Sequence, residues 1–200
     1  MTCAPSAGND AEARPAGPWR VLMVCTANQC RSPMAQLLLA RDLVAAGIGA
    51  DRVQVSSAGV RASAGIPVTP QTAHQLLQRG IDPAPIMSSP LTDEMVRDAN
   101  IVLTATRNHR SQVLERVPLA LRRTFTLLEF AAIVRDFQRA DDAQGLTDWV
   151  RRAAAARAVT AVAAYDIDDP AGGPDEGYAE AAAVIAQACH GIAVALIAAV

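Results

Sequence analysis

An unbroken apolar run near the start of the chain places the strongest constraint on the fold. Residues 20–25 read RVLMVC, which is typical of a strand buried on both faces of a parallel sheet. A polar turn over residues 26–31 follows it. Ser32 as N-cap and Pro33 at the first helical position then predict a helix, which Gly47 ends. A buried strand that leads through a short turn into a helix is typical of an α/β fold.

Strand and helix signals alternate along the rest of the chain. Apolar patterning predicts three more strands, over residues 53–57, 101–105 and 124–128. Helices are predicted over residues 70–78, 107–116, 129–139, 148–164 and 179–200. This alternation predicts a three-layer α/β sandwich, in which a central four-stranded parallel sheet has helices on both faces. Ligands of such sheets bind at the carboxyl ends of the strands, so we expect the site in the turn after Cys25.

The composition is that of one globular domain. Of the 200 residues, 51% are hydrophobic and 19% are charged, which allows a full hydrophobic core. We predict a flexible tail over residues 1–18, which are rich in alanine, glycine and proline, and one domain over residues 19–200. Within that domain, residues 140–164 are predicted to form a helical insertion.

Charge and cysteine content argue against several classes of function. A net charge of −2 predicts no nucleic-acid partner and no attraction to an anionic membrane. The apolar C-terminal stretch contains Glu180, Gln187 and His190, so we interpret it as a packed helix and not as a membrane span. The N-terminus has no apolar signal-peptide core, and the four cysteines include no C-x-x-C pair. We therefore expect a cytoplasmic protein that uses no metal and no cofactor.

The residues suited to chemistry are concentrated in the turn itself. The Cys25 loop, as we name residues 25–32, reads CTANQCRS. A short loop that wraps onto a helix N-terminus turns backbone N–H groups inward and forms a nest for an anion. Arg31 can hold two phosphate oxygens with its planar guanidinium. The same positive field favours the thiolate form of Cys25, to which the Ser32 hydroxyl can donate. C-x5-R-S between a strand and a helix therefore predicts a nucleophile beneath a bound phosphate.

Two other residues of the loop have simpler interpretations. Asn28 is typical of a turn position with positive φ. Cys30 on its own is typical of a small buried side chain. Because Cys30 lies five residues from Cys25, it is also a candidate resolving thiol, which would trap an oxidised Cys25 as a disulfide. Both interpretations of Cys30 stay open at this point.

Several motifs resemble those of one enzyme family. The sequence VLMVCTANQCRSPMA is similar to the signature of low-molecular-weight protein-tyrosine phosphatases, which carry C-x5-R-S directly after the first strand. The S-A-G at residues 57–59, the G-x-P at residues 65–67, the segment of residues 98–110 and the loop YDIDDPAGG resemble later motifs of the family. Together with the alanine- and arginine-rich composition, the resemblance implies a bacterial, actinobacterial-like member.

The resemblance implies a role for each residue of the loop. Cys25 would be the nucleophile that forms a phosphocysteine, and Arg31 would bind the phosphate. Asn28 would shape the loop, and Ser32 would assist the thiolate. Other residues would line or support the phosphate site: Thr26, Ala27, Gln29, Cys30 and Ser57.

The resemblance also implies a general acid. Asp169, which precedes Pro170, matches the family's D-P pair and would protonate the leaving group before activating water in the second step. Asp166 and Asp168 are close competitors for this role, but neither aligns with the D-P pair. Without the Cys25 loop, a carboxylate that caps the next helix would be the simpler interpretation of Asp169.

Departures from the family pattern affect the expected substrate. Ala27 replaces the usual glycine of the loop, and Ile86 aligns with a histidine that supports the loop in many members. Ala171 and Gly172 follow the D-P pair, where the family often has aromatic residues.

We expect hydrolysis of phosphate monoesters, with phosphotyrosine in a protein as the substrate. Dephosphorylation of a small phosphate ester or of phosphoarginine is an alternative, as is a non-catalytic phosphate-binding role. Arsenate reduction is disfavoured because it needs two further cysteines around residues 81–97, where the chain has none.

Overall fold

The computed structural model describes residues 17–84, 86–135 and 145–197. Residues 1–16 of the predicted tail lie outside this range, and so do residues 140–144 of the predicted insertion. The tail, the limits of the domain and the insertion therefore stay predictions.

Four parallel strands form the central sheet, in the order β2-β1-β3-β4. Their bounds are β1 (Trp19–Cys25), β2 (Val53–Gly59), β3 (Ile101–Thr104) and β4 (Thr124–Thr126). β1 lies between β2 and β3, and its last residue, Cys25, pairs with Gly59 at the end of β2. The predicted four-stranded parallel sheet is confirmed, and Cys25 lies at its carboxyl edge.

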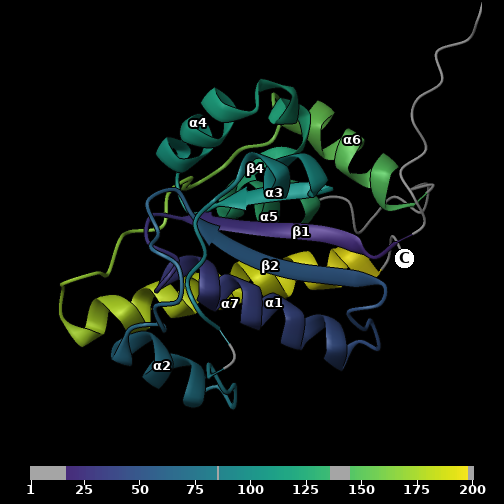
Figure 1. The fold of residues 1–200 in the computed structure, drawn as a ribbon. Coiled ribbons are helices and arrows are strands. Elements are labelled where there is room, and N and C mark those ends of the chain that lie inside the picture. Colours follow the sequence, from purple (N-terminus) through teal and green to yellow (C-terminus); the bar gives the residue numbers. More distant parts are fainter. Residues whose placement is uncertain (1–16, 85, 136–144, 198–200) are drawn as a thin grey trace, which may run out of the picture.

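Helices cover both faces of this sheet (Figure 1). They are α1 (Arg31–Ala45), α2 (Pro70–Leu77), α3 (Asp93–Asp98), α4 (Arg107–Arg116), α5 (Leu127–Arg135), α6 (Leu146–Ala156) and α7 (Asp175–Ile197), with a 3₁₀ turn at Pro118–Arg123. Side chains of β1 alternate between two cores, as the strand period requires. Val21 and Met23 pack with α1, α5 and α7, whereas Leu22 and Val24 pack with α3 and α4. The three-layer architecture is therefore confirmed.

The start of α1 differs from the prediction. The helix begins at Arg31 and has Cys30 in the N-cap position, without a side-chain capping hydrogen bond. The prediction that Ser32 is the N-cap is wrong, because the Ser32 hydroxyl contacts Cys25 and Asn28 instead. Since no side chain caps the first turn, its N–H groups are free to face an anion.

The end of β4 also differs from the prediction. The strand stops at Thr126 and not at residue 128, and α5 begins at Leu127. A capping box explains the difference: the Glu129 backbone N–H donates to Thr126 Oγ1, and the Thr126 N–H donates to Glu129 Oε2, both at 3.2 Å. These two bonds place Leu127 and Leu128 in the first turn of the helix, although their apolar character had predicted a strand.

The last two helices have shifted limits. α6 ends at Ala156, short of the predicted residue 164, and α7 begins at Asp175, ahead of the predicted residue 179. α7 is long and apolar enough to cross a bilayer, with a mean hydropathy of 1.7 over its most apolar window, but 50% of that window is buried inside the molecule. This burial, mainly against α1 and α5, is that of a packed core helix.

Candidate active site

The Cys25 loop lies against the end of β2. Cys25 is buried, and its Sγ lies 3.0 Å from Ser32 Oγ. A Cβ on Gly59 would lie 2.5 Å from the Thr26 carbonyl oxygen and 2.8 Å from the Asn28 nitrogen. Only glycine permits this approach, which gives the S-A-G motif a physical reason.

Asn28 connects the loop to its surroundings. It is fully buried and has a φ of 56°, which confirms the predicted positive φ. Its Nδ2 donates to Ser32 Oγ at 2.9 Å and to Ser57 Oγ at 2.8 Å, and its Oδ1 accepts from the Ser89 N–H at 2.8 Å. Because Ser32 Oγ accepts from Asn28, its own proton is available to Cys25 Sγ. The roles predicted for Asn28, Ser32 and Ser57 agree with this network.

The loop residues Ala27, Gln29 and Cys30 are not part of this network. Asn28 is the one non-glycine residue with positive φ in the described chain, so Ala27 fits its position without left-handed backbone. The Gln29 carbonyl accepts from the Thr69 N–H at 3.2 Å, and Cys30 Sγ lies 3.6 Å from Thr69 Oγ1. Cys30 is buried and packs with the core, and its thiol is free. A disulfide between Cys25 and Cys30 stays a prediction.

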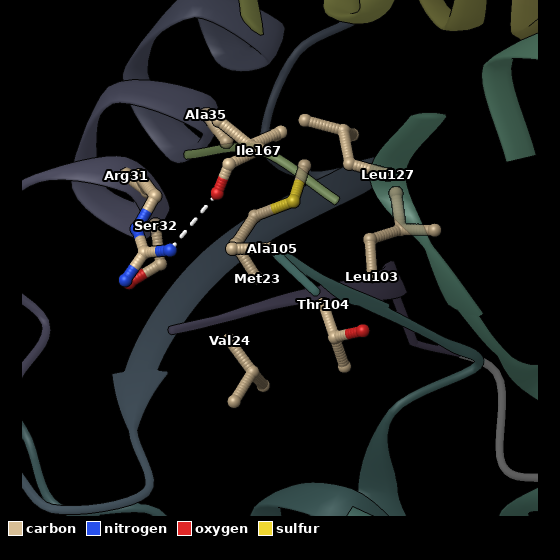
Figure 2. Close-up of a pocket in the computed structure, with 10 residues that line it drawn as sticks. All are labelled: Met23, Val24, Arg31, Ser32, Ala35, Leu103, Thr104, Ala105, Leu127 and Ile167. Carbon is tan, nitrogen blue, oxygen red and sulfur yellow. Dashed lines mark hydrogen bonds between the residues drawn. The ribbon is translucent and has the colours of Figure 1, made fainter. Parts of the chain in front are cut away.

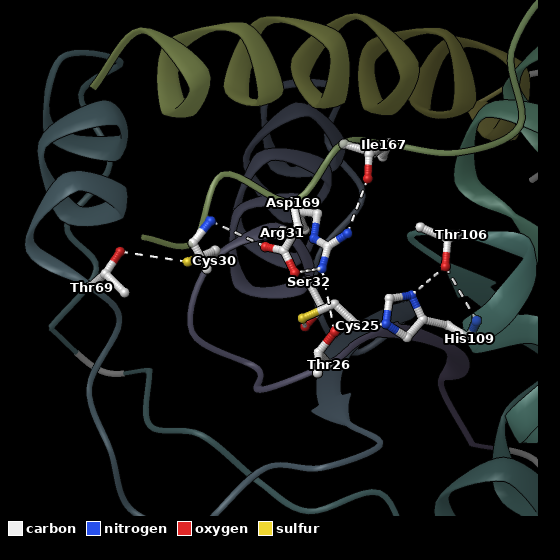
Figure 3. Close-up of polar contacts among 11 residues, drawn as sticks. Cys25, Thr26, Cys30, Arg31, Ser32, Thr69, Thr106, His109, Ile167 and Asp169 are labelled. Atoms are coloured by element: carbon white, nitrogen blue, oxygen red, sulfur yellow. Dashed lines mark hydrogen bonds and ion pairs between the residues drawn. The ribbon is translucent and has the colours of Figure 1, made fainter. Parts of the chain in front are cut away.

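Arg31 brings a guanidinium to the mouth of the loop (Figure 3). Its Nη1 donates to the Ile167 carbonyl at 3.0 Å, and its Nη2 donates to Thr26 Oγ1 at 3.4 Å and to the carboxylate of Asp169. Its Nε is buried and has no hydrogen-bond partner among the described residues. One donor of the fork is therefore free for a ligand.

Arg31 lines one side of a small, mostly apolar cavity beneath the loop (Figure 2). The same cavity is lined by Met23, Leu103, Leu127 and Ile167. The guanidinium already has one anionic partner, the Asp169 carboxylate, but its buried Nε has no acceptor among the described residues, and an unsatisfied buried donor is costly. The arrangement therefore favours binding of an anion at the guanidinium.

The acid loop, as we name residues 166–173, places its carboxylates differently. Asp169 points at Arg31 and is partly exposed, whereas Asp166 accepts hydrogen bonds from the Arg107 backbone N–H at 2.7 Å and from its guanidinium. Burial acts to raise the pKa of Asp166, but these hydrogen bonds outweigh it, and the pKa is lowered overall. These bonds hold Asp166 at Arg107, and of the three described carboxylates in the acid loop only Asp169 hydrogen-bonds to a residue of the Cys25 loop.

Ala171 and Gly172 are exposed, as the sequence suggested, and offer no aromatic wall beside Asp169. The Ala171 N–H donates to Asp169 Oδ1 at 3.2 Å. Ile86 is partly buried; Ser89, three residues later, supplies a backbone N–H to Asn28, and so this segment still supports the loop.

Sequence reasoning missed His109. It is buried in the first turn of α4, and its Nε2 lies 2.9 Å from Thr26 Oγ1. Its pKa is lowered to about 4, chiefly by burial and also by the charge of Arg31. The available signal was its position: it closely follows the predicted strand of residues 101–105, at the same sheet edge as Cys25.

Comparisons with known proteins agree on one family. Residues 20–148 match the model of the low molecular weight phosphotyrosine protein phosphatase family. A protein-arginine-phosphatase of Geobacillus stearothermophilus is 39% identical over 115 residues, which are 58% of this chain and 73% of that protein.

Solved structures show the same likeness. The YwlE arginine phosphatase from Geobacillus stearothermophilus superposes with a TM-score of 0.66 at 32% identity, over 88% of this chain and 92% of that one. The low molecular weight protein tyrosine phosphatase from T. tengcongensis gives a TM-score of 0.66 at 27% identity, over 87% and 97%.

Proposed function

Because the chain belongs to the low molecular weight phosphotyrosine protein phosphatase family, we propose that it removes phosphate from protein side chains through a phosphocysteine at Cys25. The observation that carries this proposal is the buried Nε of Arg31, which has no hydrogen-bond partner in the part of the chain that the structure describes. It lies on a guanidinium that already faces Thr26 and Asp169 beside the Cys25 loop. A phosphate oxygen is the natural acceptor for this donor.

The contacts support a two-step transfer. In the first step the Cys25 thiolate attacks phosphorus, so that a P–S bond forms and the bond to the leaving group breaks. Asp169 gives its proton to the leaving atom. In the second step water attacks phosphorus, returns a proton to Asp169 and breaks the P–S bond. The Ser32 hydroxyl, 3.0 Å from Cys25 Sγ, stabilises the thiolate at the beginning and at the end.

Substrate must first release Asp169 from Arg31. The carboxylate contacts Nη2, one of the two nitrogens available to phosphate oxygens. A bound phosphate dianion competes for this nitrogen and repels the carboxylate, which then lies free beside the leaving group. The exposure of Asp169 permits this movement without disturbing the core.

Hydrolysis of an aryl phosphate in the presence of a chelator tests the proposal. Cys25→Ser is expected to abolish turnover and to keep binding of inorganic phosphate or vanadate. Cys189→Ala is the matched control, because Cys189 is a buried free thiol on α7 that donates to the Ala35 carbonyl, away from the loop. Substantial turnover by Cys25→Ser would refute the proposal.

Phosphoarginine is a second candidate substrate, beside phosphotyrosine. The absence of a ring at Ala171 and Gly172 removes stacking that would favour an aryl group. The exposed carboxylates of Asp168 and Asp169 suit a guanidinium leaving group, and the relative at 39% identity is a protein-arginine-phosphatase.

Paired peptides that differ only in phosphoarginine or phosphotyrosine would separate the two, with a small phosphorylated metabolite as a third arm. Phosphoarginine is favoured if its kcat/KM is at least tenfold higher. A preference for phosphotyrosine would restore the expectation from sequence.

We also propose that the protein works in the cytoplasm. Cys25, Cys30 and Cys189 are free thiols, and a catalytic thiolate needs a reducing compartment. Recovery of the protein in a membrane or secreted fraction of its cell would contradict this location.

A further inference from the structure

The hydroxyl of Thr26 lies between two nitrogen groups that belong to different helices. Arg31 Nη2 of α1 is 3.4 Å away, and His109 Nε2 of α4 is 2.9 Å away. His109 is 4% exposed, and its other nitrogen, Nδ1, lies 2.8 Å from Thr106 Oγ1. Figure 3 shows the resulting chain of contacts, which runs from Thr106 through His109 and Thr26 to Arg31.

The number of hydrogen-bonding protons on these four side chains limits which atom can donate to which. A guanidinium only donates, so Thr26 Oγ1 accepts from Arg31. Thr106 Oγ1 is the N-cap of α4 and accepts from the His109 backbone N–H at 3.2 Å. If the imidazole carries its proton on Nε2, Thr26 accepts twice, and its own proton remains for the anion in the Cys25 loop. If the proton is on Nδ1, Thr26 must donate to Nε2, and that proton is lost to the site.

Burial, more than the charged groups around it, keeps the His109 imidazole neutral. Burial lowers its pKa to about 4, and the positive charges of Arg31 and Arg61 act in the same direction. The carboxylates of Asp169 and Asp166 oppose them without reversing the shift. At neutral pH the ring therefore has one N–H to place, and the two tautomers have different consequences for Thr26.

We infer that His109 is a positioning residue of the Cys25 loop: its Nε2–H donates to Thr26 Oγ1 and so reserves the Thr26 hydroxyl proton for a phosphate oxygen. Thr106 completes the arrangement by donating to Nδ1. This inference rests on the proposed function, because the anion concerned is the transferred phosphate. It adds the Thr26 hydroxyl to the donors of the site, oriented by a residue of α4, which lies on the opposite face of the sheet from α1.

Two amide substitutions separate the nitrogens of the ring. His109→Gln can present an amide N–H near the position of Nε2, whereas His109→Asn reaches only as far as Nδ1. We expect the Asn variant to lose about ten- to a hundredfold in affinity for inorganic phosphate and in kcat/KM, the usual weight of a hydrogen bond to a charged group. The Gln variant should recover most of that loss. Melting temperatures of both variants serve as the control for folding.

Phosphate affinity, measured by calorimetry, does not require turnover. A protein that binds phosphate but hydrolyses nothing would defeat the proposed function and leave the inference on His109 standing. Equal phosphate affinity in the Gln and Asn variants would overturn the inference. A second measurement needs no variant: ¹⁵N chemical shifts of the His109 ring report its tautomer, and a proton on Nδ1 would also overturn it.

Discussion

The two loops that meet at the active site are held with very different firmness. The Cys25 loop is largely buried, and Asn28 hydrogen-bonds to Ser32 within it and to Ser57 and Ser89 outside it. The acid loop is largely exposed: the side chain of Asp169 is 46% accessible, against 5% for Arg31. At its start, the Ile167 N–H donates to the Ala105 carbonyl at 2.9 Å.

This difference separates two tasks. Phosphate binding needs donors that are already in place, because any reorganisation reduces their effect. Proton transfer needs a carboxylate that can leave Arg31, approach the leaving group and let the product depart. A substitution that loosens the Cys25 loop, as at Asn28, should therefore lower binding and stability together, whereas a substitution at Asp169 should lower turnover without weakening phosphate binding.

The largest effect is expected at Asp169. Asp169→Asn should lower kcat by about 10²–10⁴-fold, the usual contribution of a general acid. The loss should be smaller for nitrophenyl phosphate, whose leaving group needs no proton. Phosphate affinity should hold or improve, because a competing carboxylate has been removed from Arg31.

Asp166→Asn is the control, since Asp166 pairs with Arg107 and does not contact Arg31. The measurements are kcat for nitrophenyl phosphate and for a substrate with a poorer leaving group, together with titrations of inorganic phosphate, on both variants. An equal loss at Asp166 would move the role of acid to that residue.

Asn28→Ala should disorder the Cys25 loop. It removes three hydrogen bonds, leaves the Ser89 N–H without its acceptor and places alanine at a positive φ. An unsatisfied buried donor costs about 1–3 kcal/mol, so both stability and phosphate affinity should fall.

Asn100→Ala offers a matched comparison, because Asn100 Oδ1 accepts from the Arg20 N–H at 2.8 Å far from the site. That variant should lose stability in urea unfolding and keep phosphate affinity. If Asn28→Ala bound phosphate normally, the Cys25 loop would not be as preorganised as its contacts imply.

Cys30 tests how rigid the Cys25 loop remains after oxidation. Its sulfur contacts Thr69, whereas that of Cys25 contacts Ser32, so a disulfide requires each sulfur to leave its present partner. We expect peroxide to inactivate the protein and a thiol reductant to restore it, with a Cys25–Cys30 link visible by mass spectrometry. Cys30→Ser should keep its activity and recover several-fold less after peroxide. Full recovery of that variant would make Cys30 a purely structural residue.

Local sequence signals predicted the four strands and the Cys25 loop because each of these is marked by residues that are neighbours in the sequence. An apolar run before C-x5-R-S fixes the strand, the turn and the helix together, and Asn28 satisfies the turn's need for positive φ. Predicted limits of strands and helices were wrong where side-chain capping sets the limit, as in the reciprocal hydrogen bonds of Thr126 and Glu129.

Contacts between distant segments could not be predicted in the same way. The bond from His109 to Thr26 joins residues 83 positions apart, and nothing in local spacing marks it. The different partners of Asp166 and Asp169 could not be predicted from spacing either: Arg107 holds one carboxylate and Arg31 holds the other, and which of them is the acid stays a prediction. Only the resemblance of the D-P pair had separated them beforehand.

The smallest expected effect concerns pH and the junction between the two loops. His109 contacts Thr26 of one loop and lies within electrostatic range of Asp166 and Asp169 of the other. Its pKa is near 6.5 in an unfolded chain and about 4 in the folded protein, so the unfolded state binds more protons between these values. The stability that its neutral form contributes is therefore complete above about pH 6.5 and declines as the pH falls towards about 4.

Urea unfolding across this range should show a shallower pH dependence for His109→Gln than for the parent. Asn100→Ala, which alters no titratable group and lies far from His109, should keep the parent's slope. If the unfolding free energies of His109→Gln and the parent changed in parallel with pH, the pKa of His109 would not be lowered in the folded protein. The conclusion that its imidazole is buried and neutral at the junction would then be wrong.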